Sequence, residues 1–259
     1  MYEIFSDPTL LLILSSIGFI AGFIDAVAGG GGLLTVPALL TTGLPPHLAL
    51  GTNKLAACFG SFTSSLTFYK KKLFDPIFWW RSALATAIGA IIGTVLVNML
   101  SGELLDKLLP IVILLCAVYT LFARSALTER STLPAPSQRL YRQQKIQGLT
   151  LGCYDGVAGP GTGTFWVVSN LYLYKMNILL SSALAKSMNF ISNIVSLSVF
   201  FYLGEVHLVY GLALGIFMIF GSWLGAHSAI RYGSKFIRPI FIMVVISMAL
   251  KLAYSAWFV

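Results

Sequence analysis

The 259 residues are 57% hydrophobic and only 10% charged, with a mean hydropathy of +0.85. Soluble domains average about 25% charged residues, so this composition is typical of an integral membrane protein. The formal net charge of +8 would suit a nucleic-acid-binding protein, but the Lys and Arg residues fall in short connections between apolar runs. They form no single basic face, so we expect a lipid bilayer and not a nucleic acid as the partner.

Apolar segments that we expect to be helices follow one another along the whole chain. In the first half they are expected at residues 8–28, 30–43, 48–69, 78–100 and 107–123, and in the second half at 146–160, 161–174, 179–203, 206–230 and 237–258. Most of them reach or approach the roughly 17–25 residues that span a bilayer as a helix. The second segment of each half has only about 14 residues, or roughly 21 Å of helix. We therefore expect an all-α polytopic membrane protein in which each short segment forms a re-entrant hairpin or a broken helix with its predecessor.

A duplicated motif relates the two halves. The stretch GFIDAVAGGG, which begins at Gly22, recurs 130 residues later as GCYDGVAGPG, so that Asp155 corresponds to Asp25. Further along, Lys186 corresponds to Lys54 at an offset of 132 residues. An ordered series of Asp, Lys and Gly in register indicates an internal duplication. We predict two membrane repeats, 1–123 and 146–259, joined by a linker at 124–145.

The distribution of charge predicts that the two repeats are inverted. Each repeat has an odd number of crossings whether its Gly-rich pair spans the membrane or turns back, so its ends should lie on opposite sides. Counted in this way, the Lys and Arg residues of the connections fall on one face, except Lys107 and Lys251. Because basic residues concentrate in cytoplasmic loops, we expect a cytoplasmic linker and periplasmic termini in a bacterial inner membrane.

Four ionisable side chains remain inside the apolar segments: Asp25, Lys54, Asp155 and Lys186. A charge at mid-bilayer costs at least about 2.5–3.5 kcal/mol, so each needs a partner. Two interpretations are open. In the first, each aspartate braces the lysine of its own repeat, Asp25 with Lys54 and Asp155 with Lys186. In the second, the lysines bind an anionic substrate, and the aspartates orient them or carry a coupling proton.

Glycine-rich breaks precede both short segments, at residues 29–32 and 159–163. Glycine lets backbone N–H groups approach a ligand closely, and a helix N-terminus attracts anions. Half-helices that meet at the midplane hold carboxylate-like groups in secondary transporters, although glycines also serve tight helix crossing. The residues that we expect to bind a small anion are Gly29, Gly30, Gly31, Gly32, Asn53, Lys54, Gly159, Gly161, Thr162, Gly163, Lys186 and Asn189.

In the motifs GFIDAVAGGGG (22–32), GTNK (51–54), DGVAGPG (155–161) and AKSMN (185–189), the chain resembles the TauE/SafE (TSUP) family of sulfite and organosulfonate exporters. Within that family it looks closest to the YfcA-like bacterial branch. The resemblance covers nearly the whole chain and implies an inner-membrane permease that exports sulfite, sulfonates or related sulfur-containing anions. Pro160 and Thr162 replace glycines of the first motif, so we expect the two halves to contact the substrate unequally.

Alternating access of a secondary transporter is the mechanism that we expect, with a small anion as the partner; a homodimer is compatible with the sequence. The alternative is a cation (Na⁺ or H⁺) carrier or channel that uses Asp25 and Asp155. The sequence has no His-Glu-x-x-His, Gly-x-Ser-x-Gly or Walker-type motif. We therefore expect no enzyme, no cofactor, no metal and no ATP-driven transport by this chain alone.

Several other residues indicate packing or anchoring. The three cysteines are widely spaced in apolar stretches, which favours burial over a disulfide framework. Helix packing is expected of Gly89, Gly93, Gly221 and Gly225, which are spaced as Gly-x-x-x-Gly. Trp79, Trp80 and Trp257 lie near predicted helix ends, where they are expected to anchor the helices at the membrane interface.

Overall fold

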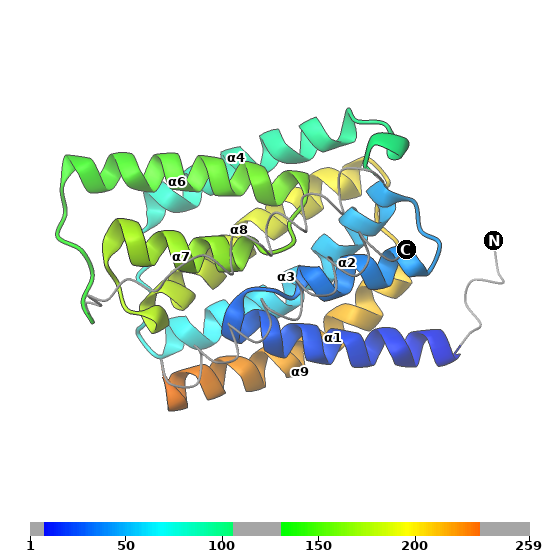
Figure 1. Cartoon of the computed structure of the whole chain (residues 1–259), viewed down its shortest axis with the longest axis horizontal. Coiled ribbons are helices and arrows are strands. Elements are labelled where there is room, and N and C mark those ends of the chain that lie inside the picture. The colour runs from blue at the N-terminus through cyan, green and yellow to red at the C-terminus, as the bar shows by residue number, and fades with distance from the viewer. Residues whose placement is uncertain (1–7, 106–130, 234–259) are drawn as a thin grey trace, which may run out of the picture.

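The computed structural model describes residues 8–105 and 131–233. Over these ranges it consists of helices and loops, with no β-strand, and the long helices run side by side (Figure 1). The helices are α1 (Pro8–Ala28), α2 (Gly32–Thr41), α3 (Pro46–Lys70), α4 (Trp80–Asn98), α6 (Gln138–Val157), α7 (Thr162–Tyr174), α8 (Ile178–Tyr202) and α9 (Leu208–Tyr232). By length and composition, α1, α4, α8 and α9 can each cross a membrane. The prediction of an all-α membrane protein is confirmed. The expected segments at 107–123 and 237–258, together with Cys116 and Trp257, lie outside the described residues.

Most helices begin and end within about two residues of the positions that hydropathy predicts. The exception is α6, which begins at Gln138 and not at residue 146. The Ser137 side chain caps it by accepting a hydrogen bond from the Leu140 N–H at 3.1 Å. The first turns of α6 are polar, so a search for apolar segments misses them, and residues 138–145 of the predicted linker are helical.

The two short helices turn back inside the bundle. In Figure 1, α1 enters from the right and α2 returns toward the right, whereas α6 enters from the left and α7 returns toward the left. We call α1 and α2 the first hairpin, and α6 and α7 the second hairpin. Gly29 (φ +86°) and Gly159 (φ +83°) stand in the left-handed region at the two turns, where a side chain is strained. Both Gly-rich pairs are therefore helical hairpins that turn back within the bundle.

Each half of the chain packs mainly on the other half. Helix α1 packs on α9 and α4 packs on α6, while α3 contacts α9, α8 contacts α4, and α3 and α8 contact each other. If the repeats are superposed in sequence, α1 corresponds to α6, α3 to α8 and α4 to α9, and every one of these contacts has a counterpart. The two halves thus share one core and do not form separate domains.

Glycines allow the closest of these helix crossings. A Cβ added to Gly93 of α4 would collide with the backbone of Cys153 on α6, and one added to Gly221 of α9 would collide with Phe19 on α1. A Cβ added to Gly89 or Gly225 would lie 2.3 or 2.6 Å from a backbone oxygen of the same partner helices. The packing role predicted for these four glycines is confirmed.

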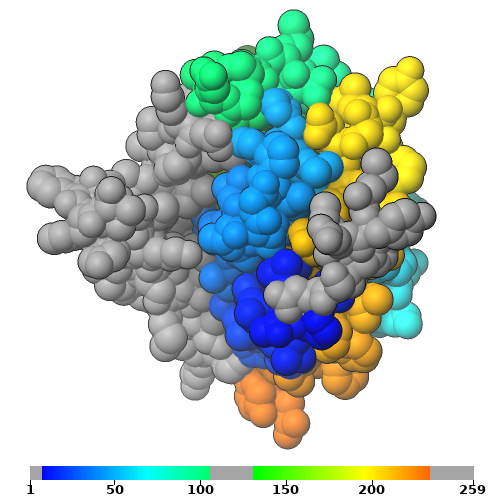
Figure 2. Space-filling model, turned by 90° about the vertical axis from the view of Figure 1, so that its right-hand side faces the viewer, coloured from blue at the N-terminus to red at the C-terminus, as the bar shows by residue number. Residues whose placement is uncertain are grey.

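Basic side chains gather at one end of the bundle, where α3 ends and α4, α6 and α8 begin. This end, which we call the basic end, carries Lys70, Lys71, Lys72, Arg81, Arg139, Arg142, Lys145, Lys175 and Arg231. At the opposite end the described residues bring Glu103 and Glu205 and no Lys or Arg. There the start of α3 lies beside the segment after α8 (Figure 2), and the His207 N–H donates to Thr52 Oγ1 at 2.8 Å.

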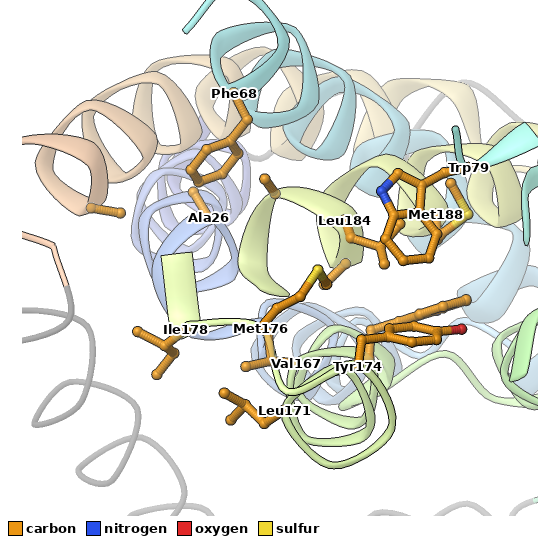
Figure 3. Close-up of a cluster of buried hydrophobic side chains, with 14 of the residues drawn as sticks. Ala26, Phe68, Trp79, Val167, Leu171, Tyr174, Met176, Ile178, Leu184 and Met188 are labelled. Carbon is orange, nitrogen blue, oxygen red and sulfur yellow. The ribbon is translucent and has the colours of Figure 1, made fainter. Parts of the chain in front are cut away.

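A hydrophobic cluster fills the bundle near its basic end. Trp79 packs on Tyr174 with ring centroids 5.0 Å apart, and Leu184 and Met188 of α8 lie beside Trp79 (Figure 3). Trp79 is only 1% exposed, so its predicted role as an interface anchor is wrong: this aromatic side chain belongs to the core. Trp80, at the start of α4, is 51% exposed.

Candidate functional site

The two glycine-rich breaks lie against each other in the interior. A Cβ added to Gly163 would lie 2.7 Å from the Gly29 Cα, and one added to Gly32 would lie 3.3 Å from the Pro160 Cα. Across the same contact, Thr164 Oγ1 donates to the Ala28 carbonyl at 3.0 Å. The tips of the two hairpins therefore meet backbone to backbone, which only residues without a Cβ permit at this distance.

Each buried lysine pairs with the aspartate of the other repeat. Lys54 Nζ lies 2.9 Å from Asp155 Oδ1, and Lys186 Nζ lies 3.0 Å from Asp25 Oδ2. The interpretation in which Asp25 braces Lys54 and Asp155 braces Lys186 is therefore wrong. The reason is geometric. The tips of the two hairpins meet in the interior, so the aspartate of each hairpin lies beside the lysine of the opposite half. These four side chains are the charged ones that lie buried among the described residues.

The Lys54–Asp155 pair is hydrogen-bonded at every polar atom. Besides Asp155 Oδ1, the Lys54 ammonium donates to the Asp155 carbonyl and to Asn193 Oδ1, the latter at 3.3 Å. The carboxylate also accepts from Thr162 Oγ1 at 3.1 Å and, through Oδ2, from Ser192 Oγ. The three N–H donors of Lys54 thus have three acceptors, and this pair has no unused donor.

The Lys186–Asp25 pair has far fewer partners. Among the described residues, the Lys186 ammonium donates to Asp25 Oδ2 alone, so two of its three N–H groups have no acceptor. Asp25 Oδ1 accepts one further hydrogen bond, from the Gly31 N–H at 3.2 Å. The Asp25 side chain is 9% exposed, against 1% for Asp155. The two pairs correspond in sequence but differ in how firmly they are held.

The two ion pairs occupy different levels along the bundle. Lys186 is eight residues into α8, which begins at the basic end, and Lys54 is eight residues into α3, which begins at the opposite end. At 1.5 Å per residue, each lysine lies roughly 12 Å along its helix, about a third of the helix length. One pair therefore stands on each side of the point where the breaks meet, and Lys186–Asp25 stands on the side of the basic end.

A small cavity of about 20 Å³ lies between the breaks. This volume suffices for about one water molecule but not for a four-atom oxyanion, so the site in this structure has no room for a bound anion. The cavity is lined by Asp25, Gly29, Gly32, Asn53, Ala57, Asp155, Gly159, Gly161, Gly163, Asn189, Asn193 and Met218.

Most of the residues that the sequence nominates for the site come together at this point. Asn53 accepts a hydrogen bond from Thr35 Oγ1, and Thr162 bonds to Asp155. Lys54 and Lys186 do not line the cavity but lie behind Gly159 and Gly163, where an added Cβ would come within 3.1 and 3.0 Å of their ammonium nitrogens. Gly30 and Gly31 are buried in the turn of the first hairpin and do not line the cavity.

Ser192 contributes to the site but is not predicted from the sequence, and Asn193, which is a candidate neutral donor by its closeness to Asn189 in the sequence, contributes as well. They follow Asn189 by three and four residues on α8, so they lie on the same helix face as Asn189. Their helical spacing from Asn189 is the signal that points to them. Ser192 donates a hydrogen bond to Asp155, and Asn193 accepts one from Lys54. Both contacts depend on how the two hairpins pack against each other.

Comparison with known proteins identifies the relatives of this chain. The sequence profile of the family described as "Sulfite exporter TauE/SafE" matches residues 14–252. The "Probable membrane transporter protein" of Haemophilus influenzae is 38% identical over 96% of this chain and 97% of the relative. The "Probable membrane transporter protein YfcA" of Escherichia coli is 34% identical over 96% of this chain and 92% of the relative. No solved structure matches. With a profile match over nearly its whole length and relatives of this similarity, the chain belongs to the TauE/SafE family.

Proposed function

We propose that this protein is a secondary transporter that exports small anions, of which sulfite and sulfonates are the first candidates, by alternating access between the two hairpins. The observation that carries the proposal is the pair of buried lysines held against the meeting point of two glycine breaks. An anion at this point would meet ammonium groups and the N-termini of α2 and α7, which favour negative charge. The family description names sulfite, which supports a sulfur oxyanion as the cargo.

The direction of the helices supports an inverted arrangement of the repeats in a bacterial inner membrane. In Figure 1, α1 and α3 run toward the basic end, whereas their counterparts α6 and α8 run away from it. We place the basic end in the cytoplasm, because Lys and Arg concentrate there, and the end with Glu103 and Glu205 in the periplasm. On this assignment the linker is cytoplasmic, both termini are periplasmic, and the hairpins enter from opposite faces.

The ion pairs also bear on the alternative of a cation carrier. A cation bound by Asp25 or Asp155 would have to displace a lysine that already neutralises the carboxylate. The four buried charges sum to zero, so the interior offers a cation no net attraction. The same balance leaves each lysine available to an anion once its aspartate is displaced or protonated, and for this reason we favour anion transport.

A flux measurement tests the proposal. Purified protein in proteoliposomes should release preloaded sulfite, or one of a panel of sulfonates and carboxylates, faster than empty liposomes do. Replacing Lys54 and Lys186 separately by Ala should remove that flux while the protein stays folded. A Na⁺ or H⁺ current that needs no anion would instead favour the cation carrier.

A further inference from the structure

The two corresponding lysines of the site differ in their unused hydrogen-bonding capacity. Lys54 donates three hydrogen bonds, two to Asp155 and one to Asn193, whereas Lys186 donates one, to Asp25. An oxyanion needs donors that are not already taken, because breaking a buried hydrogen bond leaves both of its members unsatisfied. The lysine prepared to accept a ligand is therefore Lys186.

Further unused donors lie near Lys186. Asn189, one turn along α8 from Lys186, lines the cavity, and its side-chain amide makes no hydrogen bond to the described residues. The N–H groups of Leu33, Leu34 and Thr35 donate to the carbonyls of Gly30 and Gly31, whereas the N–H of Gly32, which begins α2 and lines the same cavity, has no acceptor among the described residues. Asn189 and Gly32 on the cavity wall, with Lys186 behind Gly163, thus offer donors that have no acceptor among the described residues.

Binding of an anion there creates a charge problem that one proton solves. The site holds two lysines and two aspartates and is neutral. A monovalent anion that takes Lys186 from Asp25 leaves one negative charge uncompensated in the interior, where burial of an unpaired charge is costly. Asp25 would keep only its bond from the Gly31 N–H. A proton taken up from solvent onto the Asp25 carboxylate restores neutrality, and Lys186 stays an ammonium throughout.

The other charged and titratable groups around Asp25 do not offer a better proton acceptor. Asp155 on α6 is held by Lys54, Thr162 and Ser192. Cys58 on α3 is a buried thiol that carries no negative charge for a proton to neutralise. His227 of α9 lies on the outer face, where its ring is tilted against that of Trp223 with ring centroids 4.6 Å apart. Helices α2 and α7 bring no Asp, Glu, His, Lys or Arg.

We propose that Lys186, not Lys54, is the lysine that binds the transported anion, that Asp25 takes up one proton as the anion displaces it, and that Lys54–Asp155 stays closed during this step. The inference rests on the proposed function and refines it. Because the Lys186–Asp25 pair stands on the side of the basic end, this is also the pair that an anion arriving from that end meets first. The departure of Pro160 and Thr162 from the first glycine motif is part of the asymmetry, since Thr162 helps to hold Asp155 closed.

The test measures sulfite binding to the purified full chain by calorimetry in two buffers of different ionisation enthalpy, which gives the number of protons taken up per anion. Sulfite exchanges a proton of its own near neutral pH, so the quantity of interest is the difference between the unmodified protein and Asp25→Asn. We expect that difference to be one proton. The ratio of the Kd values of the unmodified protein and Asp25→Asn should then change roughly tenfold per pH unit. This change holds over the pH range in which Asp25 is ionised in the free protein and protonated in the complex with the anion.

Three further variants locate the effect. Lys186→Gln should lose binding, whereas Lys145→Gln, which removes an exposed positive charge of α6, should bind as the unmodified protein does. Ser192→Ala, which loosens the Asp155 carboxylate without removing a charge, should keep the proton uptake that Asp25→Asn loses, whatever its affinity.

The outcomes separate this inference from the proposed function. If the unmodified protein binds neither sulfite nor any sulfonate or carboxylate, the proposed function is overturned, and this inference with it. If sulfite binds but Lys186→Gln binds it equally well, or if Asp25→Asn and the unmodified protein take up the same number of protons, the inference alone is overturned.

Discussion

Replacing Gly163 by alanine would place a methyl group at the contact between the two hairpins. The new Cβ would lie 2.7 Å from the Gly29 Cα and 3.0 Å from both the Gly29 carbonyl oxygen and Lys186 Nζ. Two of these neighbours are backbone atoms, which cannot turn aside, so the tips must separate. Overpacking of this kind costs about 1–3 kcal/mol, which for a chain of this size lowers Tm by roughly 2–12 °C.

The assay compares Tm and sulfite flux of Gly163→Ala with those of Gly102→Ala. Gly102 has no atom within 4 Å of an added Cβ and no positive φ, so it is a matched control for the substitution itself. We expect Gly163→Ala to lower Tm and to reduce flux more than the loss of stability explains, because the methyl group also displaces Lys186. Flux and Tm equal to those of Gly102→Ala would refute the backbone contact.

The remaining predictions concern the ion pairs, the helix crossings and the caps. Asp25→Ala alone should cost about 3–5 kcal/mol of stability because it leaves Lys186 unpaired. In a double-mutant cycle, adding Lys186→Ala should recover part of the lost Tm, whereas adding Lys54→Ala should not. The reverse pattern would show that each aspartate pairs with the lysine of its own repeat. Gly93→Ala should lower Tm by forcing α4 away from Cys153 on α6, and an unchanged Tm would contradict that crossing. Ser137→Ala and Asn177→Ala, which remove the caps of α6 and α8, should each cost about 1 kcal/mol in thermal unfolding, and a threonine at position 137 should keep most of the stability.

Hydropathy predicts most of the fold because the bilayer requires apolar helices of spanning length. An apolar run of about 20 residues has few alternatives to a helix in lipid, and α1, α3, α4, α8 and α9 lie close to their predicted positions. The early start of α6 escapes this reasoning, since residues 138–145 are polar and only the cap at Ser137 marks their helix.

The composition of the site is predictable from the sequence, but the pairing within it is not. Asp25, Lys54, Asp155 and Lys186 stand out because charges are expensive in an apolar segment. Sequence distance favours partners in the same repeat, yet the interlocking hairpins bring partners together from opposite repeats. Corresponding residues of a repeat also look equivalent in the sequence. The difference between Lys54, whose three N–H donors all have acceptors, and Lys186, which has one acceptor, appears only once Asn193 and Ser192 are placed.

The central claim is that an anion binds where the two glycine breaks meet, and the most direct measurement locates it there. Selenite is a heavier analogue of sulfite whose selenium gives an anomalous diffraction signal, so crystals of the unmodified protein grown with selenite would mark the bound anion. The account predicts a selenium peak close enough to Lys186 Nζ for a selenite oxygen to accept a hydrogen bond from it, between the breaks at residues 29–32 and 159–163, and no such peak in Lys186→Gln. A peak confined to the surface lysines of the basic end, with the interior still closed, would contradict it.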